Sequence, residues 1–190
     1  MLLPLLDSDG YYVIIETGAT GGNDYAKTSY ILKQYDASEG AEIAVKSAAP
    51  TVDKQVYDND DKAATGDNNG WGESADHAIN ETFQMKLIAT IPADEDFAAY
   101  KAYKVAFHDT YNKGITFENI ASVTVAGETV NAGEAKTDCQ LASNTTNRTL
   151  DITINDIVPA ITAASKKLGT DEITVEVIYN VHLNEDAATV

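Results

Sequence analysis

One strand-like segment carries a carboxylate on its apolar side. In YKAYKVAFHD, one phase of a period-two alternation holds Tyr103, Val105, Phe107 and Asp109. Side chains in one phase of a strand point to the same face of the sheet. If this face is buried, Asp109 must be paired, protonated or catalytic, because an isolated carboxylate in an apolar interior is energetically costly.

A lysine shows the same pattern in TVDKQVY, where Val52, Lys54 and Val56 share one phase. The structural interpretation is a buried ion pair with Asp109, or a lysine whose stem packs while its ammonium reaches water. The chemical interpretation is a pair that exchanges protons, so that the neutral amine attacks an Asn carboxamide and ammonia leaves. The product would be a Lys–Asn isopeptide bond, made by proximity alone and without a cofactor.

The amide for such a bond is available in EITVEVIYNVHLNEDA, which contains Asn180 and Asn184. The apolar residues of this segment, from Ile173 to Leu183, alternate on one face, and both Asn side chains fall on the other. A bulge, a strand that ends at Leu183, or burial of both faces would reconcile this pattern with a buried bond. Periodicity does not choose between the two Asn residues.

The elements that must position these residues are predominantly strands. Strand patterns occur at 11–17, 28–35, 41–46, 51–57, 82–91, 100–109, 121–127, 148–154 and 172–183. Gly-rich and Asn-rich turns separate them, and this spacing favours an antiparallel sandwich over alternating strands and helices. Two short helical pieces are predicted, at 94–100 and at 156–169.

Composition excludes several classes of partner and cofactor. Among 190 residues, 30 acidic and 13 basic side chains give a formal charge of −17, which disfavours nucleic acid and anionic membranes. No apolar run is long enough to span a membrane, and the single Cys139 cannot form an internal disulfide. The acidic loop that starts at Asp58 fails the EF-hand pattern, because Lys62 and Ala63 stand at a ligand position and at the turn glycine.

The histidines predict no metal centre either, since His77, His108 and His182 fall on different elements or faces. The sequence also contains no phosphate-binding glycine loop and no GxSxG motif. We therefore expect neither a metal nor a cofactor.

Four stretches together resemble a known family. KSAAPTVDKQV, WGESADHAINETF with QMKLIATIP, FHDTYNKGITF and EITVEVIYNVHLNEDA occur in the order found in isopeptide-forming domains of sortase-assembled fimbrial (pilin) subunits of Gram-positive bacteria. The resemblance covers residues 46–187 and implies an immunoglobulin-like β-sandwich of the collagen-adhesin type with short helical insertions. DGYYVIIET, at 9–17, resembles the closing part of a preceding pilin domain.

The resemblance also implies a domain organisation. Residues 1–49 would be the C-terminal part of a preceding β-rich module with its linker, and residues 50–190 the isopeptide-forming domain. The family has a further strand after the LNEDA stretch, so we expect this domain to be truncated there or completed by another chain.

By position, the resemblance implies that Lys54 forms the bond, Asp109 shuttles the proton and Asn184 supplies the amide. Asp76 is the next candidate for the acid. Lys46 stands near the place of the lysine that sortase joins to the next subunit, although an exposed linker lysine is the simpler interpretation of that residue.

The function implied is that of a structural subunit of a fimbria, of the shaft type, at the extracellular cell wall. Its partners would be neighbouring pilin subunits and sortase, with a host-surface ligand left open. It would not be an enzyme, because it reacts once and on itself. The alternative is a surface adhesin or carbohydrate-binding sandwich in which Lys54 and Asp109 form only an ion pair.

Overall fold

The computed structural model describes residues 10–14, 31–35, 49–58, 70–130, 141–146 and 148–188. The chain divides into two compact units, Met1–Pro50 and Thr51–Val190. In the first unit, β1 (Gly10–Ile14) pairs antiparallel with β2 (Ile31–Tyr35). The strand predicted at 41–46 lies outside the described residues.

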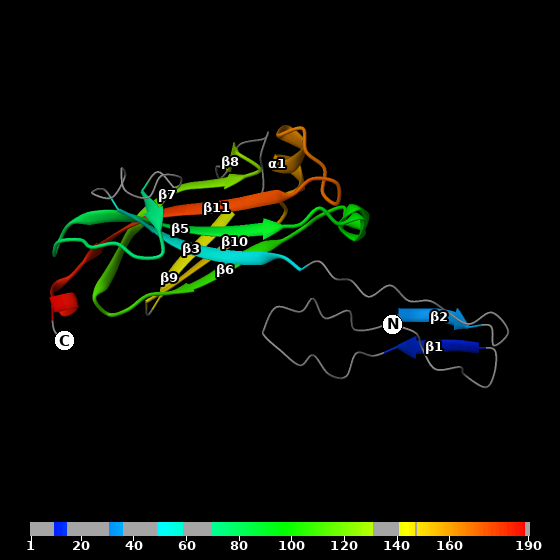
Figure 1. Ribbon diagram of the computed structural model, residues 1–190, viewed down its shortest axis with the longest axis horizontal. Coiled ribbons are helices and arrows are strands. Elements are labelled where there is room, and N and C mark those ends of the chain that lie inside the picture. Colours follow the sequence, from blue (N-terminus) through cyan, green and yellow to red (C-terminus); the bar gives the residue numbers. More distant parts are fainter. Residues whose placement is uncertain are drawn as a thin grey trace. The chain divides into compact units, whose positions relative to one another are not determined.

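The second unit contains two sheets (Figure 1). The larger sheet has the order β4-β3-β5-β11-β7-β8, and the smaller has the order β6-β10-β9. The strands of the larger sheet are β3 (Thr51–Tyr57), β4 (Trp71–Gly72), β5 (Thr82–Ile91), β7 (Ile115–Val125), β8 (Glu128–Thr129) and β11 (Ile173–Leu183). Those of the smaller sheet are β6 (Val105–Thr110), β9 (Leu141–Thr146) and β10 (Thr149–Ile154).

The two sheets bury one common core between them. β11 contributes Ile173, Val175, Val177, Tyr179 and Val181, all fully buried, and β10 contributes Leu150, Ile152 and Ile154. Alternate residues of each strand therefore face the opposite sheet, as period-two patterning requires. The expectation of an all-β sandwich is confirmed.

β3 and β11 lie on either side of β5, and their register with β5 shows how they are aligned. Thr51 of β3 and Thr174 of β11 both pair with Thr90. At the other end of β11, His182 pairs with Thr82. β3 and β11 therefore run in the same direction, each antiparallel to the strand between them.

Short helices connect the strands, as predicted. η1 (Glu95–Ala99) lies in the first predicted helical piece and α1 (Val158–Ala163) in the second, and η2 (Glu185–Ala188) follows β11. α1 has proline in its first turn, where the missing N–H costs no helical hydrogen bond. No helix in the described ranges is long and apolar enough to cross a membrane.

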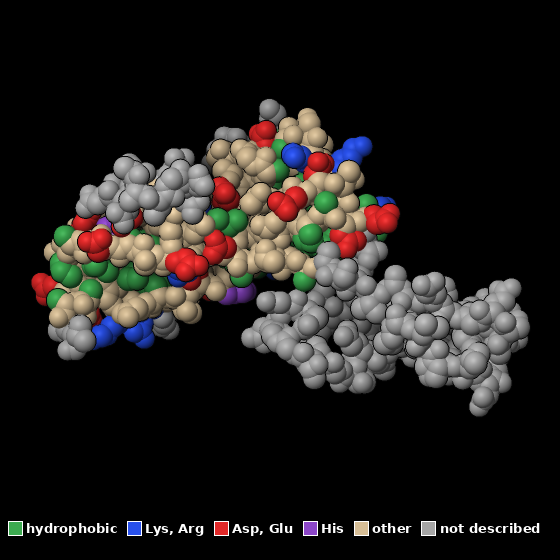
Figure 2. All heavy atoms as spheres, in the orientation of Figure 1, with side chains coloured by type: hydrophobic (Ala, Val, Ile, Leu, Met, Phe, Trp, Pro, Cys, Tyr) green, Lys and Arg blue, Asp and Glu red, His purple; other side chains and the backbone are tan. Residues whose placement is uncertain are grey.

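Several strands differ from the prediction. β6 starts at Val105 rather than at 100, and the two-residue strands β4 and β8 were not predicted. β7 starts at Ile115 rather than at 121, because register shifts beside Ile178/Tyr179 and Asn180/Val181 break the alternation in its first half. β9 was not predicted, since its sequence LASNTT is largely polar and pairs only with β10. Acidic side chains are spread over the face shown in Figure 2, in keeping with the charge of −17.

Two glycines with positive φ provide a test of the packing. A Cβ on Gly169 (φ +87°) would lie 2.5 Å from the backbone nitrogen of Ala98, whereas a Cβ on Gly127 (φ +84°) meets nothing within 4 Å. Gly127→Ala should lower the free energy of unfolding by about 1 kcal/mol through backbone strain alone. Gly169→Ala should cost clearly more, because η1 must also move. Denaturant unfolding of both variants measures the difference, and equal losses would contradict the close approach of η1.

Candidate functional site

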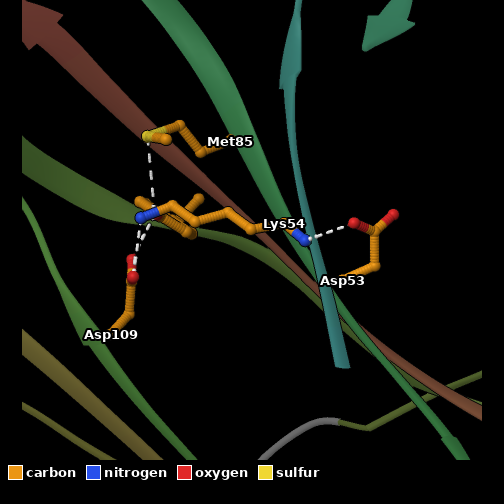
Figure 3. Close-up of polar contacts among 5 residues, drawn as sticks. Asp53, Lys54, Met85 and Asp109 are labelled. Carbon is orange, nitrogen blue, oxygen red and sulfur yellow. Dashed lines mark hydrogen bonds and ion pairs between the residues drawn. The ribbon is translucent and has the colours of Figure 1, made fainter. Parts of the chain in front are cut away.

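Lys54 lies on β3 at the edge of the larger sheet, and its side chain reaches across the sandwich. Its backbone pairs with Leu87 of β5. Its Nζ is 2.6 Å from Oδ1 of Asp109 on β6, in the opposite sheet (Figure 3). The Lys54 side chain is 35% exposed and that of Asp109 is 8% exposed, so water reaches the pair from the lysine side.

Both carboxylate oxygens of Asp109 accept a hydrogen bond. Oδ1 accepts from Lys54, and Oδ2 accepts from the hydroxyl of Tyr179 at 2.5 Å. Tyr179 lies on β11 and is fully buried, and its hydroxyl is also 3.4 Å from Sδ of Met85. The alternating side chains that end in Asp109 therefore face the core. The Asp109 carboxylate accepts one hydrogen bond from each of two strands of the facing sheet, β3 and β11.

The environment of Tyr179 favours its protonated form. Burial raises the pKa of Tyr179 well above its ordinary value, and the hydrogen bond to Asp109 and the negative charge of that carboxyl raise it further. Tyr111 adds a smaller effect in the same direction. The phenol therefore remains a hydrogen-bond donor throughout the physiological pH range.

Lys54 and Asp109 are brought together, but the two predicted amides are not brought to them. The side chain of Asn180 lies outside the core, donating to Oδ1 of Asn119 at 2.9 Å and accepting from Gln84 at 3.2 Å. No described Asn or Gln carboxamide is hydrogen-bonded to Lys54 or Asp109.

Asn184 is held at the end of β11 by a separate set of bonds. Its Nδ2 donates to the carbonyl of Lys113 at 2.9 Å and to Oγ1 of Thr116 at 3.0 Å. Through Leu87, Lys54 is level with Val177 in the sheet. Seven residues of strand then separate it from Asn184, a distance of about 23 Å along the strand.

The three histidines occupy separate places. Nε2 of His77 is 2.9 Å from the carbonyl of Tyr57, Nδ1 of His108 is 2.7 Å from Asp151, and Nδ1 of His182 is 2.9 Å from Glu118. Across the part of the chain that the structure describes, no group of three or more His, Cys, Asp or Glu side chains could hold a metal ion.

Two other residues were considered from the sequence, Asp76 as an acid and Lys46 as a site of joining to the next subunit. Asp76 is exposed, and Lys46 lies outside the described residues. Most of the acidic loop, at 59–69, lies outside them as well.

The β3 edge beside Lys54 is open within the described residues, since β4 pairs only with Val56 and Tyr57. The backbone N–H of Lys54 donates instead to Oδ1 of Asp53 at 2.9 Å (Figure 3), and Gln55 donates to the other oxygen of that carboxylate. Val52, on the inward phase, is 71% exposed. An apolar side chain that points inward yet remains uncovered marks a gap at this edge of the sandwich.

Sequence reasoning missed Tyr179 as part of the site. The alternation placed it on the apolar face of its strand, where every neighbour in phase is aliphatic. A buried tyrosine hydroxyl needs a hydrogen-bond partner. This requirement could have indicated that Tyr179 contacts a polar group in the core. The identity of the partner depended on the packing of the two sheets.

No protein-family model matches the chain, and no curated protein matches it. Its structure is similar to those of several major pilins. A 35 kDa C-terminal fragment of the major pilin GBS80 of Streptococcus agalactiae is 18% identical, with a TM-score of 0.44. The match covers 72% of this chain and 44% of that fragment.

Two further similar structures are also pilins. BcpA, the major pilin subunit of Bacillus cereus, is 16% identical with a TM-score of 0.48, and the match covers 94% of this chain and 45% of BcpA. The full-length major pilin RrgB of Streptococcus pneumoniae is 20% identical with a TM-score of 0.43, and the match covers 88% of this chain and 26% of RrgB. The chain thus spans less than half the length of each of these three structures.

The raised pKa of Tyr179 predicts a loss of stability in alkali. Above pH 10, the ordinary pKa of a tyrosine, the unfolded chain releases this proton while the folded chain keeps it. The folded state then binds more protons, so the free energy of unfolding falls as pH rises, by about 1.4 kcal/mol per pH unit for one proton. Denaturant unfolding between pH 9 and pH 11.5 should show a shallower decline in Tyr179→Phe. Identical slopes in the two proteins would contradict this assignment.

Proposed function

We propose that this chain is part of a structural subunit of a cell-surface pilus, and that Lys54, assisted by Asp109 as proton shuttle, forms an intramolecular isopeptide bond with an Asn side chain. The observation that carries the proposal is the 2.6 Å contact between the Lys54 amine and the Asp109 carboxyl across the two sheets. A lysine beside a buried acid is the arrangement that nucleophilic attack on a carboxamide requires. The sequence resemblance to isopeptide-forming pilin domains supports the same function.

In the proposed reaction, the Lys54 ammonium gives a proton to Asp109 and its nitrogen attacks the carbonyl carbon of an Asn carboxamide. The new C–N bond forms as the bond to the amide nitrogen breaks. The carboxyl gives its proton to that nitrogen, which leaves as one ammonia, and the carboxylate then takes up the second proton that the Lys54 nitrogen loses as it becomes an amide. No oxidant, metal or nucleotide takes part, so the reaction needs only that the groups be held together.

Asn184 remains the proposed amide on the ground of sequence resemblance. This requires the end of β11 to leave its pairing with β5 and β7, as well as the bonds of Asn184 to Lys113 and Thr116. A strand laid along the open edge of β3 is the second source that we propose. It would cover Val52 and place alternate side chains beside Lys54. Such a strand would come from outside the described residues or from another chain.

The first test is the intact mass of the folded protein. We expect a mass lower than that of the sequence by one ammonia. Lys54→Ala and Asp109→Ala should restore the full mass, because the first removes the nucleophile and the second the proton acceptor. Lys104→Ala, which removes another lysine near β6, is the matched control and should keep the loss. A full mass in the parent protein would exclude the bond and leave an ion pair.

The same assay identifies the amide. Loss of the ammonia difference in Asn184→Ala, but not in Asn180→Ala, would assign the bond to Asn184. If both variants keep the difference, the amide comes from another segment. A bond to Asn184 would close a loop of 184 − 54 = 130 positions and, by analogy with disulfides, stabilise the fold by roughly 5 kcal/mol. The thermal midpoint of Lys54→Ala should then fall by many degrees.

The alternative function is a surface adhesin or carbohydrate-binding module without a cross-link. It is favoured by one observation, that both oxygens of Asp109 already have donors and neither predicted amide lies beside them. The mass measurement separates this alternative from the pilus proposal.

We also propose neighbouring subunits and a sortase as partners at the cell wall, with Lys46 as the residue joined to the next subunit. Lys46→Arg should leave the internal mass difference unchanged. It should block polymer ladders, because the guanidinium of arginine cannot replace the lysine amine that accepts the acyl group of the next subunit. Polymerisation of the full-length subunit with its own sortase measures this, with Lys27→Arg and Lys33→Arg as controls. Ladders that persist in Lys46→Arg and vanish in a control would reassign the acceptor.

A further inference from the structure

We propose that Tyr179 is a positioning residue for the Lys54–Asp109 pair: its hydroxyl holds Oδ2 of Asp109, so that Oδ1 faces the Lys54 amine and receives its proton. This inference rests on the proposed cross-linking reaction and assigns a role that the reacting groups alone do not fill. It is carried by the two short contacts to one carboxyl, 2.5 Å from Tyr179 and 2.6 Å from Lys54.

Tyr179 is the most firmly held of the three side chains. It is fully buried on β11, a strand paired on both sides, by β5 and by β7. Phe117 packs near its ring, with 6.1 Å between the centroids. Lys54, by contrast, lies on a part of β3 that β4 does not reach, and it is 35% exposed. The hydroxyl of a buried tyrosine can therefore hold the carboxyl in one orientation more firmly than a lysine that is partly exposed to water.

The orientation decides which oxygen takes the proton. Oδ2 already accepts a hydrogen bond from the Tyr179 hydroxyl, and Oδ1 is the oxygen beside Nζ. The proton leaving the ammonium therefore goes to Oδ1, and it departs from the same oxygen when ammonia forms. Tyr179 gives up no proton during this cycle, because burial and the adjacent carboxyl raise its pKa. Its role is to orient the Asp109 carboxyl, and it is not consumed or changed in the reaction.

Tyr179→Phe removes only the hydroxyl and keeps the ring in the core. The carboxyl of Asp109 can then rotate, and the fraction of chains with Oδ1 facing the amine falls. Tyr103→Phe is the matched control, since Tyr103 is a partly buried tyrosine that packs against Phe97 and Tyr100. Circular dichroism first establishes that both variants fold.

The experiment follows the mass of newly synthesised full chain over time, at several pH values. We expect Tyr179→Phe to reach the same final mass as the parent, but at least about tenfold more slowly and with a different dependence on pH. Tyr103→Phe should match the parent at every pH. Equal rates and equal pH profiles in the two variants would overturn the role of Tyr179.

A second readout applies if the parent never loses ammonia, in which case the cross-link proposal fails by itself. The side-chain ammonium of Lys54 can then be observed by ¹⁵N NMR and assigned by its loss in Lys54→Arg. We expect a protected signal in the parent and in Tyr103→Phe, and its disappearance in Tyr179→Phe. A signal that persists in Tyr179→Phe would overturn the positioning role independently of the reaction.

Discussion

The carboxylate of Asp109, enclosed between two sheets, is the constraint on which the arrangement of this domain depends. A buried carboxylate is tolerated only when its oxygens are satisfied. Here the donors come from the facing sheet, one from β3 and one from the central strand β11. The position of β6 relative to both strands is thereby fixed by polar contacts as well as by the apolar core. A shift of either sheet by one residue would leave the carboxylate unpaired.

The fold could be predicted from the sequence where alternation was regular. β3 and β5 have the predicted bounds, and the inward phase of β11 is fully buried along most of its length. Prediction failed where register was irregular or where pairing alone defines the strand. The first half of β7 and the polar strand β9 are examples, because a bulge or a neighbouring strand leaves little trace in local sequence. Whether such segments form strands depends on pairing with residues that are distant in the sequence.

The part of the candidate site that gives a local signal in the sequence could also be predicted. A charged residue on an apolar phase is a local signal, and it singled out Lys54 and Asp109, which lie in contact. Tyr179 was harder to assign, since a tyrosine on an apolar phase is ordinary core composition. The amide partner stays a prediction. Asn184 was chosen by resemblance, and its present bonds to Lys113 and Thr116 depend on the turn before β7, which periodicity does not describe.

The direction of β3 and β11 has a mechanical consequence. The unit begins at the Thr51 end of β3, which is level with Thr174, and β11 leaves the sheet at the opposite end, beside Thr82. Tension applied through these two ends would act along the strands rather than across them. The hydrogen bonds of β5 with its two neighbours would then be loaded together in shear, instead of opening one after another from an end. This connectivity therefore resists separation of the strands when the two ends are pulled apart.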